Sequence, residues 1–165
     1  MKTLHLIRHA KSSWDFPGLS DHERPLNERG IRSCRVMGPA LVEAGCSFSD
    51  VYCSSATRAQ DTIGQIAAHI PDCQFEWHID CALYTFDSHE LLRWCQNRQS
   101  EQLTVIGHNP AITDLVNQLA GESIINVPTC AYIQLVCDIS EWSELQSGSA
   151  RVSCFIKPKQ LIRAG

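Results

Sequence analysis

The chain has 165 residues, of which 44% are apolar and 19% are charged, and its formal net charge is −4 at pH 7. This composition is typical of a single globular domain over residues 1–165 and argues against a disordered chain. The negative charge also argues against general nucleic-acid binding, because phosphate backbones attract basic surfaces.

The N-terminal half is predicted to begin with an apolar strand over 3–7. Asn27 can then cap a helix that stops at Gly45. Pro39 lies inside this helix, and we expect a kink or a restart there because proline lacks the amide hydrogen that a helix interior uses. The next two elements are a strand over 51–54 and a helix that stops before Pro71.

The C-terminal half continues the alternation of strands and helices. A weaker strand over 75–79 precedes a helix that Ser88 can cap, and a buried strand is expected over 103–107. Asn109 can cap the following helix, which ends at Gly121. Two closing strands are expected over 132–139 and 152–156.

Nine cysteines lie singly along the chain, and none forms a CxxC pair. Their spacing favours free, mostly buried thiols in a reducing compartment over a disulfide framework. The N-terminus carries charge by Arg8 and lacks the apolar core of a signal peptide, and no apolar stretch approaches the ~20 residues that cross a bilayer. We therefore expect a cytoplasmic protein without membrane contact. Catalysis by a cysteine is an alternative, but nothing marks one thiol as activated.

Strands that alternate with helices predict an α/β fold with a largely parallel sheet covered on both faces. Ligands of such sheets bind beyond the carboxyl ends of the strands. Three predicted strands run directly into polar groups, namely Arg8-His9, Ser54-Ser55 with Arg58, and His108-Asn109. If these strands are neighbours, two arginines and two histidines meet at one end of the sheet.

Two arginines and two histidines together are suited to bind a phosphoryl group. Guanidinium groups match phosphate oxygens in bidentate pairs, and an imidazole is a donor when protonated or a nucleophile when neutral. Such a set can hold a transferring phosphoryl group without a metal. Neither His9 nor His108 belongs to an HExxH or HxH pattern, so a zinc site is not expected.

These residues also carry a family resemblance. The Leu6–Ala10 segment resembles the Arg-His signature of the histidine phosphatase superfamily, and the segments that resemble its later motifs follow in the family's order. Those later segments are Arg24-Pro25-Leu26-Asn27 with Gly30, Ser54–Thr62, and Gly107-His108-Asn109-Pro110. The short chain is similar to the SixA-type phosphohistidine phosphatases, which implies a three-layer α/β/α sandwich of the phosphoglycerate mutase-like fold without a large cap insertion.

The resemblance implies a role for each matching residue. His9 would be the nucleophile and would become a phosphohistidine, Arg8 and Arg58 would bind the phosphoryl oxygens, and His108 would donate to the same group. Water would then hydrolyse the intermediate, with no metal or other cofactor. The implied substrate is a phosphohistidine-bearing protein or a small phosphorylated molecule.

Larger members of the superfamily carry a glutamate that acts as general acid, and this sequence has no clear counterpart. Asp87 and Glu90 are nearby candidates, although Glu90 also fits the first turn of a helix. An alkoxide needs such an acid in order to leave, whereas the imidazole of a phosphohistidine leaves more easily. The missing acid therefore favours a phosphohistidine substrate.

Other readings of the same residues remain open. The stretch 21–24 fits a solvated loop beside the pocket, in which Arg24 either contacts substrate or pairs with a neighbouring carboxylate. A small-molecule phosphomonoester phosphatase or a mutase could use the same scaffold. A catalytically idle phosphohistidine-binding module is a third possibility, but it would not need the nucleophile His9.

Overall fold

The computed structural model describes the backbone of residues 1–164 and the side chains of residues 1–162. The strands are β1 (Lys2–Arg8), β2 (Val51–Ser54), β3 (His78–Asp80), β4 (Gln102–Gly107), β5 (Tyr132–Cys137) and β6 (Ala150–Ile156). The α-helices are α1 (Glu28–Glu43), α2 (Thr57–Ala68), α3 (Ser88–Gln96), α4 (Ala111–Ala120) and α5 (Pro158–Ala164). Short 3₁₀ turns cover Asp21–Glu23, Cys81–Leu83 and Trp142–Glu144.

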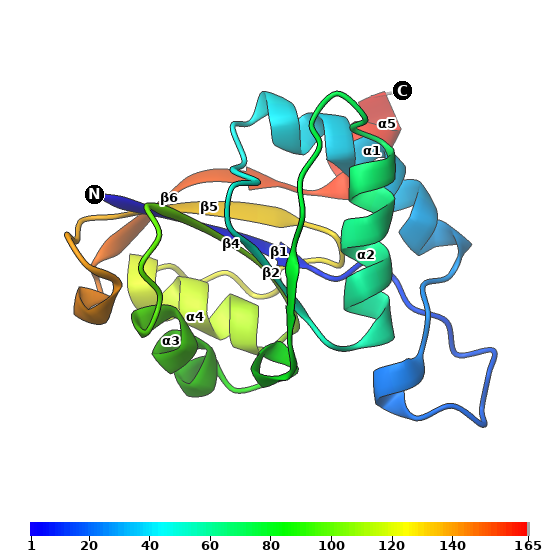
Figure 1. The fold of residues 1–165 in the computed structure, drawn as a ribbon, viewed down its shortest axis with the longest axis horizontal. Coiled ribbons are helices and arrows are strands. Elements are labelled where there is room, and N and C mark those ends of the chain that lie inside the picture. The colour runs from blue at the N-terminus through cyan, green and yellow to red at the C-terminus, as the bar shows by residue number, and fades with distance from the viewer. Residues whose placement is uncertain (165) are drawn as a thin grey trace.

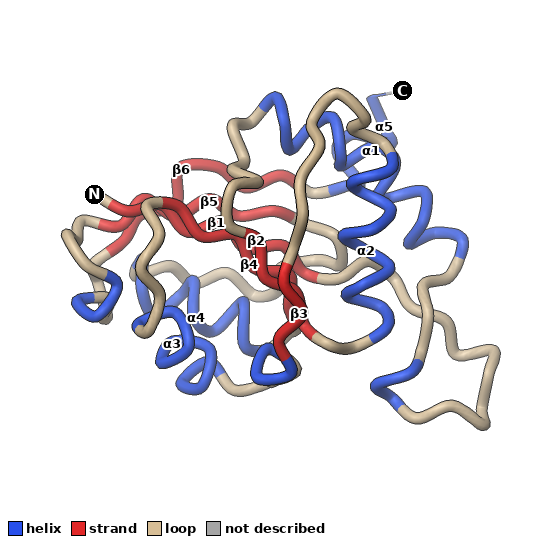
Figure 2. Tube along the Cα trace, in the orientation of Figure 1, coloured by secondary structure: helices blue, strands red, loops and turns tan. Residues whose placement is uncertain are grey.

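The six strands form one sheet in the order β3-β2-β4-β1-β5-β6 (Figure 2). The pairs β1–β4, β2–β4 and β2–β3 are parallel, whereas β5 runs antiparallel to both β1 and β6. The sheet is thus mostly parallel, as predicted. Its order places β1, β4 and β2 side by side, so the ends of these three strands are neighbours.

Helices cover both faces of the sheet (Figure 1). One core contains buried residues of α1 and α2 such as Met37 and Ile63, with Leu161 of α5 packed against it. The other core contains residues of α3 and α4 such as Leu91 and Leu115. The predicted three-layer α/β/α sandwich is confirmed.

The expected restart at Pro39 does not occur, because α1 continues from Glu28 to Glu43. Pro39 lies on the exposed side of the helix. The carbonyl of Arg35, four residues earlier and also exposed, loses its helical donor, but water can replace that donor at the surface. The predicted cap is confirmed, since Asn27 Oδ1 accepts the Gly30 N–H over 2.8 Å.

Other boundaries differ from the prediction by a few residues. The weak strand expected over 75–79 is the three-residue edge strand β3. Asp87 rather than Ser88 caps α3, since Asp87 Oδ1 accepts the His89 N–H over 2.8 Å. Asn109 lies one residue before the cap position of α4, yet its Oδ1 still accepts the Thr113 N–H. The predicted helix stops at Gly45 and Gly121 are confirmed, because both have positive φ, a region that favours glycine.

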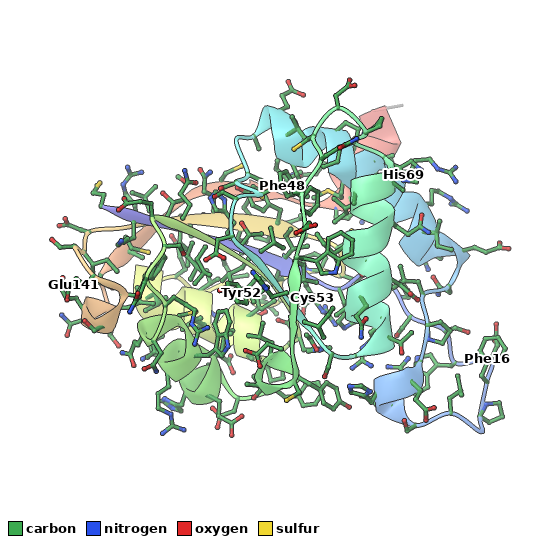
Figure 3. All side chains as sticks on the ribbon, viewed as in Figure 1. Phe16, Phe48, Tyr52, Cys53, His69 and Glu141 are labelled. Atoms are coloured by element: carbon green, nitrogen blue, oxygen red, sulfur yellow. The ribbon has the colours of Figure 1, made fainter. Side chains whose placement is uncertain are left out.

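All nine cysteines are free, and six of them are buried. Cys53, for example, lies in the middle of the molecule on β2 (Figure 3). Burial raises the pKa of Cys46 and of Cys95 to about 12. Such thiols remain protonated at neutral pH, which argues against a cysteine nucleophile at these positions.

Within the described part of the chain, no helix has both the length and the apolar character required to cross a membrane.

We expect Gly30→Ala to destabilise the fold, because a Cβ atom at position 30 would lie 2.2 Å from the Lys11 carbonyl oxygen. Overpacking of this kind costs roughly 1–3 kcal/mol. Gly64, inside α2, has open space around the equivalent position, so Gly64→Ala should stabilise the helix by about 0.5–1 kcal/mol. Urea unfolding of both variants measures the difference, and a Gly30→Ala variant at least as stable as the wild type would contradict this packing.

Candidate active site

The sheet order brings the predicted residues together at the carboxyl ends of β1, β4 and β2. Arg8 pairs with Gly107 in the β1–β4 register, so His9 and His108 are the next residues of adjacent parallel strands. Their ring centroids lie 5.2 Å apart. Arg58 reaches the same place from the first turn of α2, with its Nε 3.4 Å from His9 Nε2. The predicted convergence of the four residues is confirmed.

The backbone around His9 fixes which ring nitrogen is free. His9 Nδ1 lies 2.7 Å from the Ala10 carbonyl oxygen, which can only accept a hydrogen bond. The ring hydrogen of neutral His9 therefore resides on Nδ1, and Nε2 carries a lone pair. The Arg58 Nε–H points at that lone pair. Nε2 is thus the nitrogen able to act as a nucleophile.

His9 is neutral at physiological pH. It is 8% exposed, and burial together with the positive charges of Arg58 and Arg8 lowers its pKa to about 4, despite the hydrogen bond to Ala10. Because only the neutral ring has a lone pair on Nε2, this low pKa keeps His9 in the form that can act as a nucleophile.

Asp21 orients the Arg58 guanidinium group. Arg58 Nη2 lies 3.0 Å from Asp21 Oδ2, and Arg58 Nη1 donates to the Asp21 carbonyl oxygen over 2.7 Å. These bonds occupy the outer edge of the guanidinium group. Its Nε edge is left directed at His9, where a phosphoryl group on Nε2 would lie.

Arg8 is anchored by the loop that precedes β5. Its Nη1 donates to the Val127 carbonyl oxygen over 2.9 Å, and the Cys130 N–H donates to the carbonyl oxygens of Arg8 and His9. Cys130 adopts a positive φ of 62° in order to do so. Arg8 Nε is buried and has no hydrogen-bond partner among the described residues. It is therefore a donor that an oxyanion could satisfy.

His108 offers a second such donor. Its Nε2 lies 2.7 Å from Ser54 Oγ, which also accepts the Ala56 N–H. Burial and the neighbouring His9 and Arg58 lower the pKa of His108 to about 3, so the ring is neutral. His108 Nδ1 is buried without a partner in the described structure, and it carries the ring hydrogen in the tautomer in which the Ser54 hydroxyl donates to Nε2.

Thr62 joins the two halves of the site. Its buried Oγ1 accepts the Ala10 N–H over 2.9 Å and donates to the Arg58 carbonyl oxygen over 2.7 Å. This one hydroxyl links the segment after β1 to the first turn of α2. It explains why the second motif extends to a threonine four residues after its arginine.

The stretch 21–24, which the sequence favoured as a solvated loop, borders the site closely. Besides Arg58, the Asp21 carboxylate accepts from the Tyr84 hydroxyl over 2.6 Å and pairs with Arg24 over 3.1 Å. Partial burial opposes ionisation, but the bonds from Tyr84 and Arg58 prevail and lower the pKa of Asp21 to about 2. Arg24 also donates to Ser12 and lies under the Trp14 ring. Of its two predicted roles, Arg24 fills the pairing role.

The two predicted acid candidates make local hydrogen bonds at the start of α3. Asp87 caps α3, as described above, and Glu90 Oε2 accepts from the Thr85 hydroxyl over 2.5 Å. Glu90 faces a shallow surface hollow that Arg93 and Trp94 also line. Both carboxylates are exposed and accept hydrogen bonds from neighbours within the loop and first turn of α3.

The polar atoms at the site are suited to an anion. The residues gathered around His9 supply guanidinium and imidazole donors, and the nearest carboxylate, Asp21, is already paired with arginine. In the described chain, no three His, Cys, Asp or Glu side chains form a group that could hold a metal ion. The arrangement can bind a tetrahedral oxyanion against a free imidazole lone pair.

Comparison with known proteins places this geometry in a family. The model of the histidine phosphatase superfamily (branch 1) matches residues 4–127. The chain belongs to this superfamily. The matched residues include all four members of the site, which confirms the predicted family.

Several relatives match the chain in sequence. An uncharacterized protein of Mycobacterium tuberculosis is 30% identical over 162 residues, which cover 93% of this chain and the whole of that protein. A 2,3-bisphosphoglycerate-dependent phosphoglycerate mutase of Sinorhizobium fredii is 32% identical over 93 residues, 54% of this chain and 43% of the mutase.

Solved structures match the fold over nearly its full length. The protein histidine phosphatase SixA in complex with tungstate superposes with a TM-score of 0.79 and 22% identity, covering 96% of this chain and 99% of SixA. Phosphoserine phosphatase of Entamoeba histolytica gives a TM-score of 0.68 and 14% identity, covering 98% of this chain and all of that chain. The predicted phosphoglycerate mutase-like fold is therefore confirmed.

Removal of the Thr62 hydroxyl should weaken both the fold and the site. Thr62→Val leaves the buried Ala10 N–H without an acceptor, which costs roughly 1–3 kcal/mol, and frees the first turn of α2 that carries Arg58. Thr62→Ser keeps both hydrogen bonds and is the matched control. Thermal unfolding and phosphatase assays on the two variants test this link through the Thr62 hydroxyl. Equal unfolding temperatures and equal rates for Thr62→Val and Thr62→Ser would contradict it.

The low pKa of His9 predicts a loss of stability in acid. Its pKa of about 4 lies below the usual 6.5, so the unfolded chain takes up the proton first as the pH falls. The free energy of unfolding therefore decreases between about pH 6.5 and 4, and the His9 contribution is about 2 kcal/mol at pH 5. Urea titrations give the free energy of unfolding at about pH 7.5 and pH 5. Between these two pH values it should fall by about 2 kcal/mol less in His9→Asn than in the wild type. The same loss in both proteins would mean that His9 is not buried in its neutral form.

Proposed function

We propose that this chain is a metal-independent phosphatase that transfers a phosphoryl group from a phosphohistidine-bearing protein to His9 and then to water. The observation that carries the proposal is the lone pair on His9 Nε2, which accepts only a long hydrogen bond of 3.4 Å from the Arg58 Nε–H. A pure binding module would need the arginines but not a neutral nucleophile between them.

In the first step, His9 Nε2 attacks the phosphorus atom in line with the leaving group. The bond from phosphorus to the substrate imidazole breaks as the bond to Nε2 forms. Arg8, Arg58 and His108 Nδ1 are the groups available to bind the three equatorial oxygens. The loss of one such donor typically reduces the rate by roughly 10²–10³.

In the second step, water attacks the phosphohistidine on His9. The Nε2–phosphorus bond breaks, Nε2 regains its lone pair, and inorganic phosphate leaves with the oxygen of the water. The hydrogen bond from Nδ1 to the Ala10 carbonyl oxygen keeps the ring in one orientation through both steps. Because the ring is held in one orientation, Nε2 is already placed for the in-line geometry of both steps.

The lack of a positioned acid supports a phosphohistidine as the substrate. Asp21, with a pKa of about 2, is ionised at neutral pH and cannot donate a proton, while Asp87 and Glu90 accept hydrogen bonds from the His89 N–H and the Thr85 hydroxyl. An alkoxide leaving group needs a proton from the enzyme. The imidazole of a phosphohistidine, protonated from solvent on its second nitrogen, leaves as a neutral ring and needs no enzyme acid.

The relatives provide support of two kinds. SixA is a protein histidine phosphatase and was crystallised with tungstate, a tetrahedral oxyanion like phosphate. The mutase and phosphoserine phosphatase relatives act on phosphomonoesters, as their names state, and make a small-molecule phosphatase or mutase the competing assignment.

A substrate comparison in the presence of a chelator distinguishes these assignments. We expect turnover of a phosphohistidine peptide that exceeds turnover of phosphoserine and sugar phosphates by at least about 10²-fold, is unaffected by the chelator, and is lost in His9→Ala. A preference for monoesters would overturn the substrate class. Inhibition by the chelator would overturn the metal-free mechanism, and equal slow hydrolysis by wild type and His9→Ala would favour the idle module.

A further inference from the structure

A groove of about 480 Å³ lies between the first turns of α1 and α5. Four cationic residues line it: Arg29 and Arg32 of α1, and Lys157 and Lys159 at the start of α5. Pro128 and Ile162 contribute apolar surface between them. Figure 1 shows α5 beside α1, which explains how residues about 130 positions apart in sequence share one surface.

The four cations have no acidic partners in the described structure. The ion pairs within residues 1–162 join Lys2 to Glu101 and Asp21 to Arg24 and Arg58, and none involves the groove. Arg29, Arg32 and Lys159 are exposed, and the Lys157 ammonium group lies 5.0 Å from the centre of the Phe155 ring. A chain with net charge −4 thus gathers four of its 14 cationic residues around one groove without neutralising them.

The groove and the candidate active site share a wall. Pro128 and Thr129 line the groove, while the residues on either side of them, Val127 and Cys130, bind Arg8 and His9. Arg29 lies on the opposite wall of the groove. The next residue, Gly30, packs directly on the backbone of Lys11, which is two residues after His9. A molecule that places a phosphoryl group on His9 therefore lies close to the groove.

We propose that this basic groove, defined by Arg29, Arg32, Lys157 and Lys159, docks an acidic segment of the protein that carries the phosphohistidine. The proposal rests on the proposed function and adds to it the charge of the partner. Opposite charges across an interface raise the association rate and exclude basic partners, and the proline and isoleucine surface gives the docked segment apolar contacts.

An acidic protein segment fits the groove better than a nucleic acid does. Pro128, Pro158 and Ile162 give the groove apolar surface, and none of the described residues that line it is an aromatic residue able to stack on a base. The whole chain is also negatively charged, which opposes the approach of a long polyanion but only weakly affects a short acidic segment.

Three phosphohistidine peptides of equal length test the groove. One carries glutamates on both sides of the phosphohistidine, the second carries glutamines and the third lysines. For the wild type we expect kcat/KM on the acidic peptide to exceed that on the glutamine peptide by about tenfold, through KM, with the difference shrinking as salt increases. The double variant Arg32→Glu/Lys159→Glu should lose this preference and keep the wild-type rate on the glutamine peptide.

A matched control reverses two exposed cations outside the groove, Arg93 on α3 and Arg151 on β6. Arg93→Glu/Arg151→Glu changes the net charge by the same amount, so it should retain the preference for the acidic peptide. Equal rates on the acidic and glutamine peptides, or equal losses in both double variants, would overturn the proposal.

The two proposals can fail separately. If no phosphohistidine peptide is hydrolysed, the proposed function fails, and binding of the unphosphorylated glutamate peptide, followed by fluorescence polarisation, still tests the groove. Weaker binding to Arg32→Glu/Lys159→Glu than to the control would support an acidic partner, and absence of binding to the wild type would overturn it. Displacement of the peptide by an oligonucleotide of equal charge at equal concentration would reassign the groove to polyanions in general.

Discussion

The central constraint on this molecule is the placement of one neutral imidazole between the buried Arg58 and the half-buried Arg8. Arg8 and Arg58 repel each other and oppose protonation of His9, as the lowered pKa values of Arg8 and His9 show. Such an arrangement is stable only if each arginine has its own anchor. Asp21 supplies that anchor for Arg58, and the Val127 carbonyl oxygen supplies it for Arg8. The result is a site with donors already in position for an anion and an imidazole that stays unprotonated.

The rest of the fold is arranged to hold those anchors. Pairing of β1 with β4 puts His9 beside His108, and pairing of β2 with β4 brings Ser54 within reach of the His108 ring. Both strand pairs are buried under helices on the two faces of the sheet. The Thr62 hydroxyl then links the ends of β1 and α2. Backbone pairing and one bridging side chain therefore hold the site in place.

Much of the site could be predicted from sequence because its main residues directly follow strands or begin helices. Arg8, His9, Arg58 and His108 belong to local motifs, and the parallel sheet brings the motifs together. Asp21 was missed because its partners Arg58 and Tyr84 are 37 and 63 residues away, and an acid in a polar loop carries no local signal. The basic groove was missed for the same reason, since it depends on α5, which was not predicted. Adjacent residues able to cap a helix, such as Asp87 and Ser88, could not be distinguished by pattern alone.

We propose that His9 Nε2 is the atom that accepts the phosphoryl group. Rapid mixing with a phosphohistidine peptide, quenching in alkali and analysis by ³¹P NMR and mass spectrometry identify both the residue and the nitrogen that is modified. We predict an Nε2-phosphorylated His9 in the wild type and no phosphorylated enzyme in His9→Ala. Because Nδ1 is bound to the Ala10 carbonyl oxygen, phosphate on Nδ1 would contradict the account. Phosphate on any other residue, or a wild type that turns over without ever being labelled, would contradict it as well.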